Sequence, residues 1–222
     1  MRKISFGVLD LPFLMRFSTL KLVVVLFCIV TSCNDLGEND PAINNAFMAE
    51  MEAARVKMME DMNAVTMTMD PDVDFANMMI PHHQGSIDMA NILLKFGEHP
   101  EALELARGAM EADQESQNRL RQFLEEHGDP VPQAVHDFME EMDIVMMKMD
   151  ESMKAMHYTI DPDYDFAEMM IHHHQGAIDM SRVEFKYGEA EMALEEAKRI
   201  IEHQEKEIIE LARFRSKHGP SR

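Results

Sequence analysis

Hydrophobic positions recur at helical spacing through most of the chain, and no window shows the sustained alternation that is typical of a β-strand. The range 44–67 is representative, because its large apolar residues are spaced by four or seven: Phe47, Met51, Met58 and Met62. Ranges 73–96 and 100–128 continue the helical pattern. Asp70-Pro71 precedes the second range and Gly97 follows it, which are favoured residues for starting and ending a helix. We therefore predict three consecutive helices.

The whole pattern then returns. At an offset of 91 residues, the chain from Pro41 to Gly128 aligns without a gap with the chain from Pro132 to Gly219. A repeat of this length determines the architecture. The sequence predicts an all-α fold, a helical bundle built from two three-helix pseudo-repeats over 44–128 and 133–219, with a linker at 129–132. We expect the two units to pack about a pseudo-twofold axis, with their second helices facing each other.

The first residues have the character of a targeting segment. Residues 1–32 contain an apolar run that is too short to span a membrane as a mature helix, and we interpret them as a lipoprotein signal peptide. The run ends in Val30-Thr31-Ser32-Cys33, which resembles a bacterial lipobox. Cys33 would then carry lipid, and residues 33–43 would form a tether. The alternative is an uncleaved N-terminal anchor, and both interpretations place the domain in the cell envelope.

Composition limits the chemistry of the remaining domain. The chain has two cysteines, Cys28 in the leader and Cys33 at the lipidation site, so the mature domain has no disulfide or thiolate metal site. A formal net charge of −20 argues against a nucleic-acid partner, because binding phosphates requires a basic face. Any bound metal ion must therefore be held by methionine, histidine, carboxylate or backbone groups.

The second helix of each unit carries paired methionines followed by paired histidines. Met78 and His82, like Met79 and His83, are four residues apart, so both side chains of each pair can touch one ion. Adjacent histidines diverge by about 100° on a helix, and we expect one to enter the core and the other to lie at its rim. Met89 is too distant along this helix to share the site, unless ligands from a facing helix join it. The predicted metal ligands are Met78, Met79, His82, His83, Met89, Met169, Met170, His172, His173, His174 and Met180.

Ligand type indicates the metal. Thioether sulfur suits Cu(I) and Ag(I) best, and imidazole accepts copper in either oxidation state, while zinc remains an option through the histidine-rich clusters. Methionine also fills cores adaptably, and for Met51, Met58, Met62 and their counterparts Met142, Met149 and Met153 we expect packing. Two pairs of aspartates are expected to cap helices or orient imidazoles: Asp74 and Asp165, and Asp88 and Asp179. Four further histidines are expected to be ordinary surface residues: His99, His127, His136 and His218.

The segments 79–90 and 170–181 resemble the hallmark of the bacterial domain of unknown function 305 family, a Met-x-x-His-His-Gln-x-Ala-Ile-x-Met-Ala type motif. The resemblance implies a ferritin-like helical-bundle fold and, for some members, periplasmic copper or silver binding and resistance. Carried over by position, it implicates Met79, His82, His83 and Met89, with Met170, His173, His174 and Met180. A later family element is present as Gln204, Glu207 and Ile208, but the first unit has Asp113, Ser116 and Gln117 there. The two units are therefore expected to bind unequally, the second more strongly.

The leading functional hypothesis is an envelope lipoprotein that binds Cu(I) or Ag(I) for sequestration, buffering or resistance, with flexible thioethers on exposed helices permitting exchange. One alternative is a ferritin-like metal-dependent oxidoreductase. Di-iron bundles use Glu-x-x-His pairs, and this chain contains no such pair, which argues against di-iron but not against copper redox chemistry. The other is a structural envelope protein without metal. Docking to a copper-efflux or chaperone partner and homo-oligomerisation both stay open.

Overall fold

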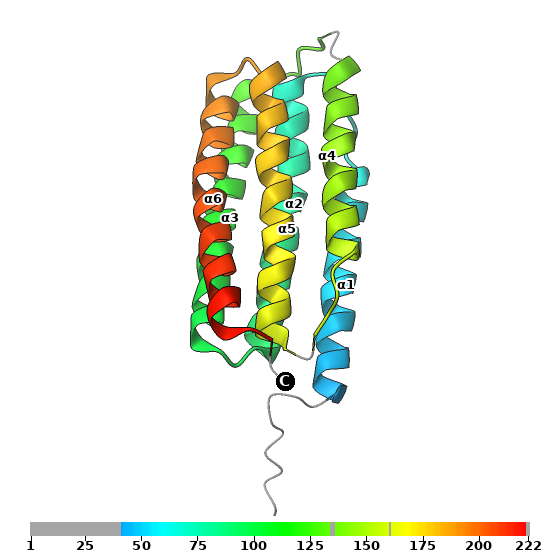
Figure 1. The fold of residues 1–222 in the computed structure, drawn as a ribbon. Helices are drawn as coiled ribbons and strands as arrows, with labels where there is room; N and C mark the ends of the chain where they lie inside the picture. The colour runs from blue at the N-terminus through cyan, green and yellow to red at the C-terminus, as the bar shows by residue number, and fades with distance from the viewer. Residues whose placement is uncertain (1–40, 134–135, 160, 221–222) are drawn as a thin grey trace, which may run out of the picture. The chain divides into compact units, whose positions relative to one another are not determined.

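The computed structural model describes residues 41–133, 136–159 and 161–220. These contain the helices α1 (Pro41–Asn63), α2 (Pro71–Phe96), α3 (Pro100–His127), α4 (His136–Lys154), α5 (Pro162–Tyr187) and α6 (Glu191–His218). The predicted all-α helical bundle is thus confirmed (Figure 1). α1 begins at Pro41, inside the range 33–43 that was expected to be tether. The predicted signal peptide and the lipidation site Cys33 lie outside the described residues.

Local sequence explains where the two central helices start. The Asp70 carboxylate accepts hydrogen bonds from the backbone N–H groups of Asp72 and Val73, and Pro71 occupies the first turn, where its missing N–H costs nothing. Asp161 and Pro162 repeat this arrangement at α5. Asp74 also serves the loop before α2, because its carboxylate accepts from the backbone N–H groups of Thr68 and Met69. The predicted capping at Asp70 and Asp161 is therefore confirmed, whereas Asp74 binds the loop before α2 and neither caps the helix nor orients an imidazole.

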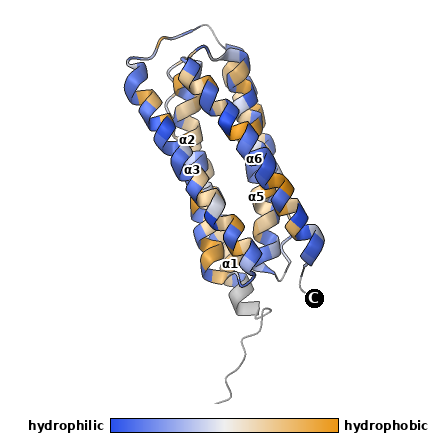
Figure 2. Ribbon diagram, turned by 90° about the vertical axis from the view of Figure 1, so that its left-hand side faces the viewer, coloured by the Kyte–Doolittle hydropathy of each residue, from blue (hydrophilic) through white to orange (hydrophobic). Residues whose placement is uncertain are grey.

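The helices α2 and α5 lie at the centre of the bundle. α2 packs against α1, α3 and α5, while α5 packs against α4, α6 and α2, and α3 also contacts α6. In Figure 2, hydrophilic residues predominate along α3 and α6, and the central helices are more apolar. Among the described residues, no helix is long and apolar enough to cross a membrane.

Each unit supplies a carboxylate that accepts hydrogen bonds at the start of a helix in the other unit. The Asp72 carboxylate at the start of α2 accepts hydrogen bonds from the backbone N–H groups of Glu189 and Ala190, which lie just before α6. Asp163, its counterpart in α5, accepts from the N–H groups of Glu98 and His99 before α3. These bonds satisfy N–H groups that a helix start leaves without an intrahelical partner. The reciprocal arrangement agrees with the expected pseudo-twofold packing.

Methionine fills much of the interior. The six residues that were expected to pack are all 3% exposed or less: Met51, Met58, Met62, Met142, Met149 and Met153. The helices that carry them, α1 and α4, also meet through an ion pair between the buried Arg55 and Asp150. The core is therefore continuous from one unit to the other.

Two glycines bring an outer helix close to each central one. A Cβ built on Gly85 would lie 2.5 Å from the Met58 sulfur and 2.8 Å from the Met58 Cβ, and Gly176 has the same relation to the Met149 side chain. Normal van der Waals contact needs well over 3 Å. Both positions follow the paired histidines by two residues. Glycine at these positions thus permits α1 to approach α2, and α4 to approach α5.

We expect Gly85→Ala and Gly176→Ala each to lower the free energy of unfolding by about 1–3 kcal/mol, because the added methyl group overpacks the helix contact. The matched control is Gly108→Ala in α3. A Cβ at Gly108 meets nothing within 4 Å, so this change should raise stability by about 0.5–1 kcal/mol through helix propensity. Urea unfolding followed by circular dichroism measures all three. Equal effects at the three glycines would contradict the close-approach interpretation.

Candidate metal centre

The repeated histidines meet where α2 crosses α5. His82, His83, His173 and His174 are all 0% exposed, and the rings of His82 and His173 lie 3.9 Å apart between centroids. The expectation that one histidine of each pair would lie at the rim is therefore wrong. Because α2 and α5 are each enclosed by three neighbouring helices, two adjacent side chains can diverge by about 100° and both stay inside.

The inner pair is oriented by one hydrogen bond across the units. The His173 Nε2–H donates to the backbone carbonyl oxygen of His82 at 3.1 Å, which leaves the Nδ1 lone pair of His173 free. Metal-binding histidines usually donate their second nitrogen to a carbonyl or carboxylate in this way. Nδ1 of His82 and Nδ1 of His173 have no hydrogen-bond partner among the described residues, although both are buried. Unpartnered buried nitrogens are costly unless something binds them.

A methionine sulfur lies at the Nε2 edge of the His82 ring. The Met149 Sδ lies 3.2 Å from His82 Nε2, across the contact between α4 and the central pair. We had expected Met149 to be simple core packing. The signal that could have revealed it is Gly176, since a glycine beside a paired-histidine motif allows a neighbouring helix to bring its side chains unusually close.

Burial keeps the inner imidazoles neutral. It lowers the pKa of His82 well below the usual value, and the nearby rings of His173 and His83 lower it further. Burial, with a contribution from His174, also lowers the pKa of His173 to about 3. Neutral imidazole has a lone pair available for a metal ion, and no proton competes for it near neutral pH.

The outer histidines have different surroundings in the two units. His83 Nδ1 lies 2.9 Å from an Asp113 carboxylate oxygen, and His83 Nε2 lies 2.9 Å from the Ser116 hydroxyl. Burial raises the pKa of Asp113, but the adjacent His83 more than offsets this and the pKa is lowered overall. Gln204 also donates to Asp113 from the other unit. Both nitrogens of His83 are thus already engaged by polar neighbours.

His174 has fewer polar contacts than His83. Its Nε2 is 3.2 Å from a Glu207 carboxylate oxygen, and its Nδ1 has no hydrogen-bond partner among the described residues. His174, Met170 and Glu207 line a cavity of about 10 Å³, which is enough for a single small ion or water. His203 approaches the same Glu207 oxygen at 3.2 Å. The second unit thus brings thioether, imidazole and carboxylate groups around one small space.

Other predicted residues are placed differently. The six methionines of the motif are at most 3% exposed, so the thioethers are not on exposed helices as we had expected: Met78, Met79, Met89, Met169, Met170 and Met180. His172 lies outside the core and pairs with Glu168 at 3.3 Å. Asp88 accepts from Gln84, and Asp179 from Lys148 and Gln175. These two aspartates therefore face polar side chains at the surface and do not orient the imidazoles.

A cleft leads from the surface to His83. It measures about 280 Å³, lies between α3 and α6, and includes His83, Asp113, Ser116 and Gln204 in its walls. At its mouth, Arg119 pairs with the buried Glu196, whose carboxylate also accepts from the Ser116 hydroxyl. An ion entering between α3 and α6 would meet His83 first.

A family model described as domain of unknown function DUF305 matches residues 72–215, a single segment that runs from α2 into α6 and includes all four buried histidines. The chain belongs to the DUF305 family. A crystal structure of a DUF305 fragment from Deinococcus radiodurans is similar in fold, with 20% sequence identity and a TM-score of 0.50. The likeness covers 66% of this chain and 96% of that one. No curated protein matches this DUF305 chain.

Proposed function

We propose that this DUF305 protein binds Cu(I), or the chemically similar Ag(I), at the buried contact between α2 and α5. The observation that carries the proposal is the inner pair, where His82 and His173 lie 3.9 Å apart with unpartnered Nδ1 atoms. The Met149 sulfur lies beside them. Imidazole and thioether groups together form a donor set suited to a soft monovalent ion.

The geometry favours this metal over zinc. Zinc sites in proteins are usually built from four ligands at tetrahedral positions, commonly nitrogen, oxygen or thiolate. Among the described residues, the central histidines and carboxylates do not bring three such ligand atoms within 4.8 Å of one another. Thioether sulfur is the ligand that Cu(I) accepts most readily. The Met149 sulfur lies at His82 Nε2, so an ion held by His82 Nδ1 would contact the sulfur as well only after a rotation of the His82 ring.

The second unit offers the better outer position. His174 has a free Nδ1 and shares a small cavity with Met170 and Glu207, whereas both nitrogens of His83 lie 2.9 Å from a polar oxygen. This difference supports the expectation that the two units bind unequally. In our proposal the second unit holds any additional ion, and the protein is a copper-binding member of its family built from two tandem copies of the motif.

The proposed role is sequestration or buffering of the metal in the cell envelope by a lipoprotein anchored through Cys33, which contributes to copper or silver resistance. Because the proposed ligands are buried, exchange requires a path, and the cleft between α3 and α6 leads as far as His83, whose ring lies 5.9 Å from that of His82. Transfer to an efflux or chaperone partner would take place at that opening. The oxidoreductase alternative has less support, because the thioether and paired imidazoles do not form a carboxylate-bridged di-iron site.

Anaerobic titration of the purified protein with Cu(I) against a chromophoric chelator tests the proposal. We expect at least one Cu(I) per chain to be withdrawn from the chelator, and Met149→Leu to weaken that binding about tenfold through loss of the sulfur, equivalent to about 1.4 kcal/mol. The matched control is Met142→Leu, a buried methionine on the same helix, which should bind as wild type does. A wild-type protein that leaves all Cu(I) and Ag(I) with the chelator would refute the proposal.

A further inference from the structure

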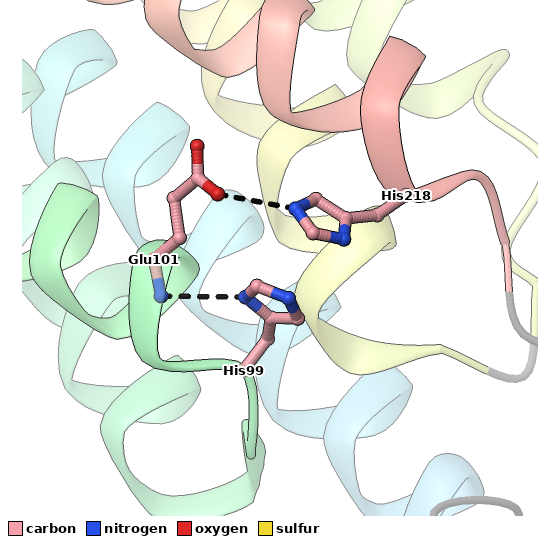
Figure 3. A group of neighbouring side chains, drawn as sticks. All are labelled: His99, Glu101 and His218. Carbon is pink, nitrogen blue, oxygen red and sulfur yellow. Dashed lines mark hydrogen bonds and ion pairs between the residues drawn. The ribbon is translucent and has the colours of Figure 1, made fainter.

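A second group of metal-ligating side chains lies at one end of the bundle, where α6 ends beside the start of α3. His99, Glu101 and His218 each offer one ligand atom, and these atoms all lie within 4.8 Å of one another (Figure 3). Among the described residues it is the one such cluster of histidine and acidic side chains. Its residues are separate from those of the buried centre, and it contains no sulfur. We had expected both histidines to be ordinary surface residues.

We propose that this cluster binds Zn²⁺. Two imidazoles and one carboxylate form a recognised set of three protein ligands for zinc, with water completing the coordination. The ligand atoms of a tetrahedral zinc site lie about 3.3 Å apart, as follows from metal–ligand distances of 2.0–2.1 Å. Small side-chain rotations from the observed positions would bring the three groups to that spacing.

The three side chains are already held together. His218 Nε2 lies 3.1 Å from the Glu101 Oε2, and the rings of His99 and His218 lie 4.0 Å apart between centroids. Phe214 packs against both rings, at 5.1 Å from His99 and 4.7 Å from His218. Because these contacts restrict rotamers before any ion arrives, binding loses less side-chain entropy than it would with free surface residues.

The local charge is suited to a cation. Hydrogen bonds from Lys217 and His218 lower the pKa of Glu101, so its carboxylate is ionised at neutral pH. The carboxyl end of α6 carries the negative end of its helix dipole, and the adjacent start of α3 carries a positive end, so the two dipoles largely offset each other and the Glu101 carboxylate supplies the charge that attracts a cation. Lys217 Nζ lies 2.7 Å from the Glu101 Oε2 in the structure, and it is the group that an incoming ion would have to displace.

His99 makes the site one of moderate strength. Its Nδ1 accepts a hydrogen bond from the Glu101 backbone N–H at 3.3 Å and thereby caps α3. A neutral imidazole has one lone pair, since the other nitrogen carries the proton. Coordination therefore replaces this capping bond, and the loss opposes binding. We expect exchangeable zinc rather than a permanently bound structural ion.

The opposite end of the bundle provides an internal comparison. The counterparts of His99, Glu101 and His218 are Ala190, Met192 and His127, so only the histidine at the helix end is repeated. His127 instead lies 3.0 Å from an Asp70 carboxylate oxygen. The proposed site is consequently present once in each chain, and it joins the two units at one end only.

Isothermal titration with Zn²⁺ of the purified protein tests this proposal. We expect one zinc per chain at this site, with affinity reduced at least tenfold in His218→Ala and in His99→Asn, where asparagine can still cap the helix. The control His127→Ala should bind zinc as wild type does. Wild-type protein that binds no zinc, or two site variants that bind it as strongly as His127→Ala does, would overturn the proposal. Both variants should retain wild-type Cu(I) binding, so this result is independent of the buried centre.

Discussion

Replacing both His82 and His173 with leucine is expected to abolish Cu(I) binding at the inner pair while leaving the metal-free protein at least about as stable as wild type. The loss of both imidazoles removes the nitrogen ligands, and we expect the affinity to fall at least a hundredfold, or about 2.7 kcal/mol. Stability should not fall with it, because buried nitrogens without partners cost about 1–3 kcal/mol each and leucine has similar bulk without that cost.

Competition titration and thermal unfolding of the same samples separate the two effects. The matched control is His172→Leu, which changes a histidine of the same helix that lies outside the core. It should retain the wild-type Cu(I) affinity. If the double variant failed to fold, or if it bound Cu(I) normally, the inner pair would be a structural feature and the proposed function would be wrong.

The stability of the wild-type protein is expected to fall between pH 7.5 and 9.5 by about 2.7 kcal/mol in total. Burial, with the neighbouring Asp72 carboxylate, raises the pKa of Glu184 to about 10. Glu184 is thus protonated in the folded state at neutral pH and ionised in the unfolded state. Each unfolding event then releases one proton, and rising pH favours unfolding by about 1.4 kcal/mol per unit until the pH passes the folded pKa. Burial raises the pKa of Asp165 only to about 6, so Asp165 does not titrate in this window.

The repeat itself supplies the test variant. The counterpart of Glu184 in the first unit is Leu93, which lies beside Asp163 as Glu184 lies beside Asp72. Glu184→Leu should therefore be accommodated, and the change of stability between pH 7.5 and 9.5 should drop below about 0.5 kcal/mol. The control Glu202→Gln, at an exposed acid, should keep the wild-type slope. Urea unfolding at several pH values measures these slopes, and a flat wild-type profile would contradict the assignment.

Much of the fold could be predicted from local sequence because its signals are local. Asp-Pro at the start of α2 and α5, and the glycine that follows each of these two helices, mark helix ends whose backbone groups are capped by neighbouring residues in the sequence. The predicted start of α2 at Val73 was two residues late, since Pro71 already lies in the first turn. The repeat then predicted that α2 and α5 would face each other. Burial of both adjacent histidines could not be predicted, because it depends on how many neighbouring helices surround α2.

The candidate sites likewise combine features that local sequence predicts with contacts that depend on how distant helices pack. The paired histidines were found from their spacing within one helix, whereas Met149 reaches His82 from a helix 67 residues away in sequence. His99 and His218 are more than a hundred residues apart and carry no shared motif, so only the packing of α6 against α3 brings them together. The two units differ in what surrounds their outer histidines: Ser116 contacts His83, and Glu207, at the equivalent position, contacts His174. The residues that are identical in the two units do not reveal this difference.

Because each unit caps a helix of the other, the molecule cannot be divided into two independent units without loss of these caps. Asp72 satisfies the first N–H groups before α6, and Asp163 satisfies those before α3, so a fragment ending after α3 would lack the carboxylate that begins its own last helix. Each fragment would instead carry the carboxylate that its partner is missing. A chain cleaved in the connection between α3 and α4 therefore has the properties required for fragment complementation, in which two separately made pieces regain order only by recombining.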